Sequence, residues 1–227
     1  MSTLLLRLAG PLQSWGIDCK FETRRTANYP TKSGIIGMVA AAMGYSREHS
    51  LEELNSLNFG IRVDHQGELL CDYHIAMAKD SYVTRRYYLS DAIFLVGLES
   101  DNIEFLQTIE NALKNPKYPL FLGRRSCPPT FPLILGIRHK DLLNSLKDEN
   151  WLLEDWRKKH ISNEYDKELR IIIDTNDLSD ISLIKDVPIS FNPIHRKFSW
   201  RNAKDMGYIC KFNEEKSTEH DPMIELR

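Results

Sequence analysis

The sequence of 227 residues is 42% hydrophobic, and its 30 Lys and Arg against 32 Asp and Glu give a formal net charge of −2. This length suffices for one large domain or two small ones, and no run approaches the ~20 consecutive apolar residues that span a bilayer. The four cysteines are scattered without a CxxC pair, which argues against a zinc site or a disulfide framework and favours a reducing cytoplasm. We expect no metal, no cofactor and no membrane partner.

Basic residues are segregated along the chain. The ranges 1–47, 114–140 and 188–204 carry six, six and four Lys or Arg against two, zero and zero acids, whereas 141–187 carries twelve acids against seven basic residues. Such a chain can present a basic face despite its acidic total. Charge alone agrees equally well with solvated basic loops that pair with acids elsewhere.

Hydrophobic patterns predict strands and helices in alternation over the first 140 residues. The start lacks a basic leader and a small-residue cleavage site, so it reads as a strand and not as a signal peptide. A polar and aromatic loop is expected at 12–31, and a hairpin around residues 64–67. The expected strands cover 3–9, 59–64, 68–75, 92–98, 120–122 and 133–137, and the expected helices cover 35–43, the stretch after Ser50 through Leu57, and 103–113.

Capping residues mark the expected helix ends. Ser33 is a candidate N-cap of the first helix, and Gly44 is placed to end it. Ser50 and Glu53 are expected to form a capping box before the second helix, and Asp101 is expected to cap the third. The resulting order of strand, helix, strands, helix, strand is the ferredoxin-like plan of the RNA-recognition motif and of many other α+β proteins, so the fold alone says little about function.

The pattern of charged and hydrophobic residues changes after about residue 140. A charged helix is expected at 142–160, either continuous or broken near Asn150, and a strand at 169–174. Short strand-like segments follow at 181–184, 189–191 and 208–212, and the polar tail from Glu214 is expected to be loose. We therefore predict two domains, 1–140 and a small, mainly β domain at 141–227.

The segment 10–16, GPLQSWG, could meet an unpaired base. Gln13 offers an amide and Trp15 an aromatic face, which can hydrogen-bond to and stack on a base. The alternative is that Trp15 anchors the core and Gln13 caps a turn. For this segment by itself, the alternative is favoured.

A possible phosphate site lies at the start of the first helix. Helix N-termini carry free N–H groups and partial positive charge. Lys32, Ser33 and Gly34 would add charge, a hydroxyl and close backbone approach, with Arg24 and Arg25 nearby. The segment does not match a Walker A loop, because Thr31 stands where that pattern requires glycine. A simple well-capped helix would explain Ser33 but not the crowding of basic residues.

Two further segments combine arginines with groups suited to RNA. Arg124, Arg125 and Ser126 lie in a loop stiffened by Gly and Pro, and planar guanidinium groups can clamp phosphate in bidentate fashion. Cys127 has no nearby His or acid and is expected to be structural. Arg85 and Arg86 alternate with aromatic residues over 82–88, which suits stacking and phosphate neutralisation, although an exposed edge strand has a similar composition.

Together these segments resemble the CasD family of type I-E Cascade complexes. The shared strings GPLQSWG, YPTKSGIIGMVAAAMG, YYLSDAIF, LGRRSCPPTFPL and FNPIHRKFSWRNA follow the family's order from Gly10 to Ala203. The resemblance implies a ferredoxin-like, RAMP-type body, a hairpin thumb at about 74–90 and a small C-terminal domain. It also implies that Arg86 is the thumb-base arginine that contacts RNA. The stretch from Tyr73 to Tyr88 is shorter than the family pattern, so a short thumb is expected.

The resemblance implies a subunit that grips the 5′ handle of a CRISPR guide RNA and joins the backbone and large subunits of a Cascade complex in antiviral defence. Target DNA would be reached only through the complex. The expected RNA-binding residues are Gln13, Trp15, Arg24, Arg25, Lys32, Ser33, Gly34, Arg85, Arg86, Arg124, Arg125 and Ser126.

Two other functions are considered, and both remain open to test. A metal-independent endoribonuclease that processes CRISPR precursor RNA would need a general base, a general acid and a cation. His195, in a basic stretch, is the best candidate base, ahead of His74 in a strand and His160 in a charged helix. In the subtype that the chain resembles, a separate subunit cuts the RNA, so no catalytic residue is predicted here. The other possibility is a scaffold that contacts only protein.

Overall fold

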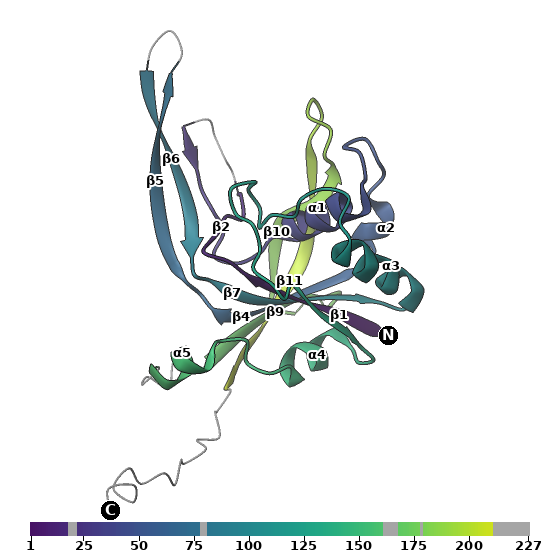
Figure 1. Ribbon diagram of the computed structural model, residues 1–227. Helices are drawn as coiled ribbons and strands as arrows, with labels where there is room; N and C mark the ends of the chain where they lie inside the picture. The colour runs from purple at the N-terminus through teal and green to yellow at the C-terminus, as the bar shows by residue number, and fades with distance from the viewer. Residues whose placement is uncertain (18–21, 78–80, 161–167, 178, 211–227) are drawn as a thin grey trace, which may run out of the picture.

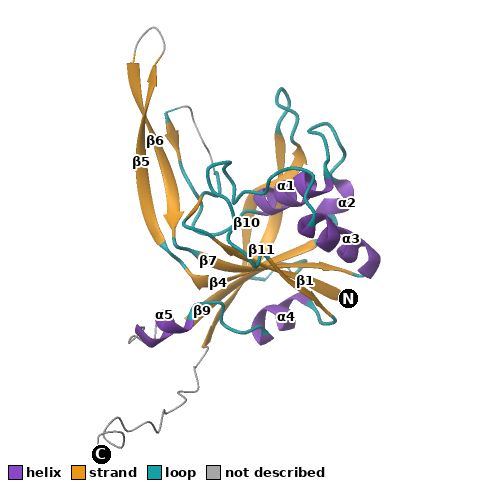
Figure 2. Cartoon of the chain, in the orientation of Figure 1, coloured by secondary structure: helices purple, strands orange, loops and turns teal. Residues whose placement is uncertain are grey.

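The computed structural model describes residues 1–17, 22–77, 81–160, 168–177 and 179–210 (Figures 1 and 2). The chain is a mixed α/β protein with largely antiparallel sheets. No helix in the described part of the chain is long and apolar enough to cross a membrane. The elements are β1 Ser2–Ala9, β2 Leu12–Gln13, β3 Thr23–Arg24, α1 Lys32–Met43, α2 Glu52–Asn55, β4 Asn58–His65, β5 Glu68–Met77, β6 Ser81–Ser90, β7 Ile93–Ser100, α3 Ile103–Lys114, β8 Ile134–Arg138, α4 Leu142–Asp148, α5 Asp155–His160, β9 Glu168–Asp174, β10 Ile181–Ser190 and β11 Lys197–Cys210.

A seven-stranded sheet in the order β10-β11-β9-β4-β7-β1-β8 forms the body. The expected hairpin between 59–64 and 68–75 is wrong, because β4 pairs with β7 and β9 while β5 pairs with β6. The chain leaves β4 through Gly67, whose φ is +69°. A Cβ there would come within 2.3 Å of the Ser90 carbonyl oxygen, so only glycine allows this close passage between the two sheets.

Both faces of the main sheet are covered, which explains why β1 reads as an almost unbroken apolar run. Leu4, Leu6 and Leu8 belong to the core that includes α1 and α3. Leu5 points to the opposite face and packs in a cluster with Leu142 of α4. Figures 1 and 2 show α1, α2 and α3 on one side of the sheet and α4 on the other.

The C-terminal strands extend the main sheet through the pairing of β9 with β4. The predicted boundary at residue 140 therefore falls within one hydrogen-bonded sheet, although the division into two domains stays a prediction. The expected helix at 142–160 is two helices, α4 and α5, and the short segments after 180 belong to two long strands. The predicted tail from Glu214 lies outside the described residues.

Local signals set some helix ends correctly and others not. Gly44 ends α1 in the left-handed conformation, as predicted. The N-cap of α1 is Thr31, not Ser33, and the N-cap of α3 is Asn102, not Asp101, because these side chains accept the N–H groups of the first turn. The capping box before α2 does not form, since the N-cap position, Leu51, makes no side-chain bond. The expected strand at 120–122 is absent.

Strands β5 and β6 form a hairpin that projects from the body (Figure 1). The hairpin begins at Glu68, earlier than the predicted residue 74, and each strand has ten residues. At about 3.3 Å per residue, each strand extends roughly 30 Å. The expectation that this thumb is shorter than the family pattern stays a prediction.

Candidate nucleic-acid interface

Strand β6 places Arg85 and Arg86 at the centre of the second sheet. One edge of β6 pairs with β5, and the other pairs with the short strands β2 and β3. The parallel register of β3 sets Arg24 beside Arg86 and Thr23 beside Arg85. One arginine from each of the predicted segments 24–25 and 85–86 therefore meets the other across two neighbouring strands, as the pair Arg24 and Arg86.

A tight loop carrying Arg124 and Arg125 docks on the segment that follows β2. Ser14 N donates to the Leu122 carbonyl at 3.1 Å, and Leu122 N donates to the Cys127 carbonyl at 2.7 Å. Gly123 has φ +84°, and a Cβ there would come within 1.8 Å of the Ser14 carbonyl oxygen. The glycine is required for this close approach, which holds the two arginines over the β2–β3 side of the sheet.

Three arginines and one tyrosine converge at this place, and we call Arg24, Arg86, Tyr88 and Arg124 the arginine cluster. Arg124 Nη2 donates to the Arg24 carbonyl at 3.0 Å. The Arg124 guanidinium lies 4.7 Å from the Tyr88 ring centroid. Arg86 and Tyr88 are two residues apart on β6, so their side chains leave the same face of the sheet.

The arginine cluster contains guanidinium hydrogen-bond donors that are unsatisfied in the described part of the chain. The buried atoms Arg86 Nε and Arg124 Nη1 have no hydrogen-bond partner among the described residues. None of the three cluster arginines forms an ion pair with a carboxylate in the described part of the chain. Because a buried N–H without an acceptor is costly, an external acceptor such as a phosphate oxygen would be favoured here.

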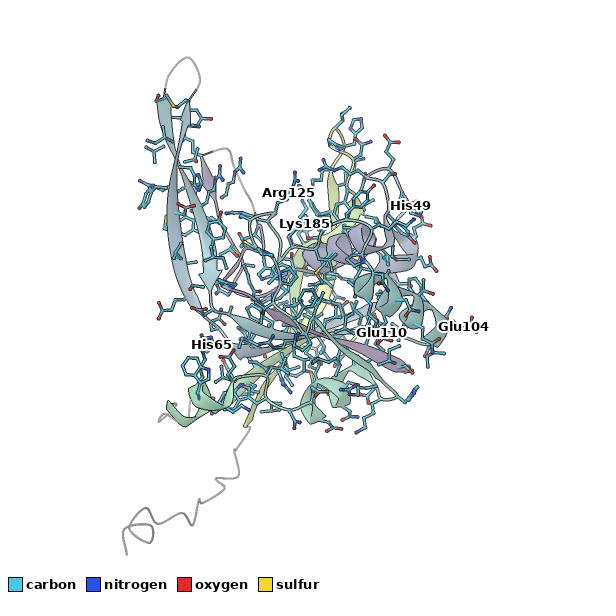
Figure 3. The ribbon with its side chains drawn as sticks, in the orientation of Figure 1. His49, His65, Glu104, Glu110, Arg125 and Lys185 are labelled. Atoms are coloured by element: carbon cyan, nitrogen blue, oxygen red, sulfur yellow. The ribbon has the colours of Figure 1, made fainter. Side chains whose placement is uncertain are left out.

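Other predicted residues lie on the surface near the cluster, with Arg85 on the opposite face of β6 from Arg86. Arg25, Arg85, Arg125 and Ser126 are exposed. The Arg85 guanidinium lies 6.0 Å from the Tyr73 ring on the β5–β6 hairpin. Figure 3 shows Arg125 on the side of the molecule from which both the β5–β6 and the β10–β11 hairpins project.

Gln13 and Trp15 belong to the core, and the prediction that their side chains contact RNA is corrected. Their exposed fractions are 0% and 1%. Gln13 Nε2 donates to the Ala92 carbonyl at 2.7 Å, and Trp15 Nε1 donates to Gln13 Oε1 at 3.2 Å. A buried indole cannot stack on a base, so these residues support the loop that carries Ser14. This is the alternative that the sequence favoured for this segment.

Lys32 is likewise internal, in a buried network of two cations and two carboxylates. Lys32 Nζ donates to Asp174 Oδ2 and to the Leu57 carbonyl, both at 2.9 Å. Arg201 donates to Asp186 Oδ1 at 2.6 Å and to Asp174 Oδ1 at 2.5 Å. The four charges cancel inside the protein, where unpaired charges would be costly. We call Lys32, Asp174, Asp186 and Arg201 the ion network.

The predicted phosphate site at the start of α1 is therefore wrong. Asp186 Oδ2 already accepts the Lys32 N–H at 2.8 Å, so the protein's own carboxylate takes the place proposed for phosphate. Ser33 Oγ bonds to Thr31 Oγ1. A Cβ on Gly34 would come within 2.8 Å of Trp15 Cε3, so Gly34 makes room for the indole and not for RNA.

Sequence reasoning missed Asp174, Asp186 and Arg201. Each lies in a segment of mixed polar and apolar residues that contains no recognisable motif. They are 142 to 169 positions away from Lys32, so no sequence spacing connects them to it. The one available signal was the location of Lys32 directly before an apolar helix. That signal fits an exposed cation equally well.

The histidines differ in their surroundings. His74 Nε2 is bonded to Asp72 Oδ2 on β5, an arrangement that can orient an imidazole as a general base. His195 is exposed in the turn between β10 and β11, and His160 ends α5. Cys127 is buried, and this burial raises the pKa of its thiol against smaller opposing effects of the Ser126 hydroxyl and Arg124.

Known proteins share this architecture. A protein-family model described as "CRISPR-associated protein (Cas_Cas5)" matches residues 3–204. The CRISPR system Cascade subunit CasD of Escherichia coli strain K12 is 38% identical over 161 residues, which cover 60% of this chain and 70% of that protein. A chain of a solved "CRISPR RNA-guided surveillance complex" superimposes with a TM-score of 0.75 at 31% identity, covering 92% of this chain and 91% of that one. The crystal structure of a Cas protein gives a TM-score of 0.71 at 34% identity and covers 92% and 95% of the two chains.

Proposed function

The chain belongs to the CRISPR-associated Cas5 family, and on that premise we propose that it is a non-catalytic, RNA-binding subunit of a Cascade-type surveillance complex. It caps the 5′ handle of the guide RNA and joins the backbone and large subunits in the cytoplasm. Its relatives support this assignment, since one is a Cascade subunit and another is part of an RNA-guided complex.

The body is proposed to be ferredoxin-like and RAMP-type. The order β1-α1-β4-β7-α3-β8, with strands arranged β8-β1-β7-β4 in an antiparallel sheet, supports this reading. The β5–β6 hairpin, inserted between β4 and β7, would be the thumb. RNA and protein contacts then fall on the second sheet and its hairpin, away from the packed faces of the main sheet.

The arginine cluster is the single observation that carries the proposal. It combines unsatisfied guanidinium donors, an aromatic ring under one of them and no carboxylate partner among the described residues. Phosphate oxygens would satisfy the donors, while exposed Arg25 and Arg125 beside the cluster would neutralise further phosphates. Arg86 at the base of the hairpin is thus the proposed centre of handle binding.

The face of the β5–β6 hairpin that carries Arg85 is proposed to contact protein. The β5–β6 register places Tyr73 opposite Arg85 and Ile75 opposite Val83 on this face. Tyr73 and Ile75 are 63% and 70% exposed, and Leu69 and Met77 extend the same row. Apolar side chains exposed in a row favour a protein partner, here the adjacent backbone subunit.

A ribonuclease remains the second candidate because of the His74–Asp72 pair. This pair lies on β5, in register with Thr84 and Arg86 of β6, so a base and a cation stand on one hairpin. Cleavage would also need a general acid beside the same phosphate. We propose that the pair is structural and that RNA is held uncut.

The full chain and a labelled CRISPR-repeat RNA separate the three functions at two salt concentrations. Salt-sensitive binding with intact RNA supports the proposal, shortened RNA supports the nuclease, and no binding supports the protein-only scaffold. Lys114→Ala is the matched control, because it removes a cation that pairs with Glu110 on α3. Binding that responds equally to Lys114→Ala and Arg86→Ala would reject the arginine cluster as the site.

A further inference from the structure

The β10–β11 hairpin carries a second exposed set of cations and aromatic rings, which we call the hairpin face: Lys185, Arg196, Lys197 and Trp200. Lys185 Nζ lies 5.7 Å from the Trp200 ring centroid, and Trp200 is 58% exposed. The Arg196 guanidinium lies 5.9 Å and 5.7 Å from the Phe191 and Phe198 rings. Cations beside exposed rings suit a ligand that has both negative charge and flat apolar surfaces.

The part of the hairpin that carries these cations, residues 184–201, has no exposed acid. Within residues 184–201 the one acid is Asp186, which is buried and bonded to Arg201 and to the Lys32 N–H. The only carboxylate within residues 184–201 is thus already bonded in the ion network. Lys185, Arg196 and Lys197 form no ion pair with a carboxylate in the described part of the chain, so their charge is available to an outside partner.

The hairpin is held firmly against the helices. Asn55 Nδ2 of α2 donates to the Pro188 carbonyl at 2.7 Å. Phe191 lies beside Gly37 of α1, where a Cβ would be 3.4 Å from the ring. Because these contacts are made by β10 and by the residue that follows it, the cations and rings stand on a fixed support, which lowers the entropic cost of binding.

A short series of contacts links the arginine loop to strand β10, which carries part of the hairpin face. Cβ atoms on Gly34 and Gly123 would come within 2.8 and 3.6 Å of the same atom, Trp15 Cε3. The arginine loop and the start of α1 therefore share one neighbour, and the start of α1 is bonded to Asp186, next to Lys185. Figure 3 labels Arg125 in its loop and Lys185 on β10.

We propose that the hairpin face is a second binding site for single-stranded nucleic acid. It binds the part of the nucleic acid that extends beyond the arginine cluster. Lys185, Arg196 and Lys197 contact phosphates, and Trp200 stacks on a base with the ring face opposite Lys185. This inference rests on the proposed function, because the arginine cluster is the first binding site for the same RNA. An acidic protein surface would use the cations but would gain nothing from base stacking.

The test uses the full chain and a fluorescein-labelled oligouridylate of about 20 nucleotides, long enough to pass both sites. The double variant Lys185→Ala/Trp200→Ala should bind about tenfold more weakly, with a salt slope lower by about one. Lys204→Ala is the matched control, since it removes a cation of β11 that pairs with Asp177, and it should bind as the wild type does. Stacking predicts that the RNA quenches tryptophan emission in the wild type and quenches it less in Trp200→Phe.

The outcomes separate this inference from the proposed function. If the wild type binds RNA in a salt-dependent way but the double variant binds equally well, the hairpin face is no RNA site and the proposed function stands. If the wild type binds no RNA, both fail. Oligodeoxythymidylate of the same length identifies the source: equal affinity assigns the site to any single strand, and weaker affinity assigns it to the guide RNA. A loss of affinity without any change in tryptophan quenching would reject stacking at Trp200.

Discussion

Arg24 and Arg124 are 100 positions apart in the sequence, yet Arg124 Nη2 donates a hydrogen bond of 3.0 Å to the main-chain oxygen of Arg24. The bond ties the loop after Leu122 to strand β3 and leaves the other end of the guanidinium, Nη1, without a partner among the described residues. A donor fixed in this way is prepared for an external acceptor.

Arg124→Ala is expected to weaken RNA binding about tenfold, because a charge-assisted hydrogen bond to phosphate contributes about 1.5–3 kcal/mol. The salt slope should fall by about one, equally for RNAs of different sequence. Fluorescence anisotropy at several salt concentrations measures both. An unchanged slope in a folded variant would move the site away from the cluster.

Arg125→Glu is expected to abolish retention of guide RNA while the melting temperature stays nearly the same. Arg125 is exposed in its loop, and a carboxylate there would repel the phosphates that the neighbouring arginines attract. Co-purified RNA and thermal melting give the two readouts. A large drop in melting temperature would contradict the assignment and favour a structural role.

Arg201→Met should destabilise the protein by about 3–5 kcal/mol, since it leaves Asp174 and Asp186 buried without one of their cations. Lys32→Met should act in the same direction. Urea unfolding measures the loss, and the salt slope of RNA binding in the folded variant should equal that of the wild type. A stable Lys32→Met protein with a flatter slope would restore the phosphate site at the start of α1.

The chain is expected to leave a labelled repeat RNA uncut, with or without EDTA. Two proton-transfer groups normally flank the reacting phosphate and contribute about 10²–10⁴-fold each. Defined fragments that persist in EDTA and vanish in His74→Ala would make the His74–Asp72 pair catalytic. The same loss in His195→Ala would instead place the chemistry on the β10–β11 hairpin.

Cys127 should react slowly with iodoacetamide at pH 8, because burial raises the pKa of its thiol and the thiolate is the reactive form. Its reactivity should increase as the pH rises further, and Cys71, which is only partly buried, should be modified first. Mass spectrometry of peptides follows both sites. Equal rates in the native protein would mean that the 123–126 loop opens readily.

The sequence by itself determined the elements whose signals are local. The apolar run of β1, the helical spacing of α3 and the glycine that ends α1 each reflect contacts within a few residues, and all were predicted at about their observed places. The grouping of basic residues with Gly and Pro also marked the loop around Arg124 correctly. These features follow from backbone preferences and hydrophobic periodicity, which the order of residues contains directly.

Only the tertiary structure decided which charged residues face outward. Lys32 and Arg86 look alike in sequence, each a cation beside a helix or strand signal, yet Lys32 meets Asp174 from 142 positions away while Arg86 meets Arg24. Strand pairing makes this difference, because β9 joins β4 and thereby brings Asp174 to the start of α1. On β6, Arg86 lies beside Arg24 of β3, and the carboxylate opposite it on β5, Asp72, is bonded to His74. A cation is buried where distant acids neutralise it and remains available where they do not, and this depends on sheet register that no local pattern specifies.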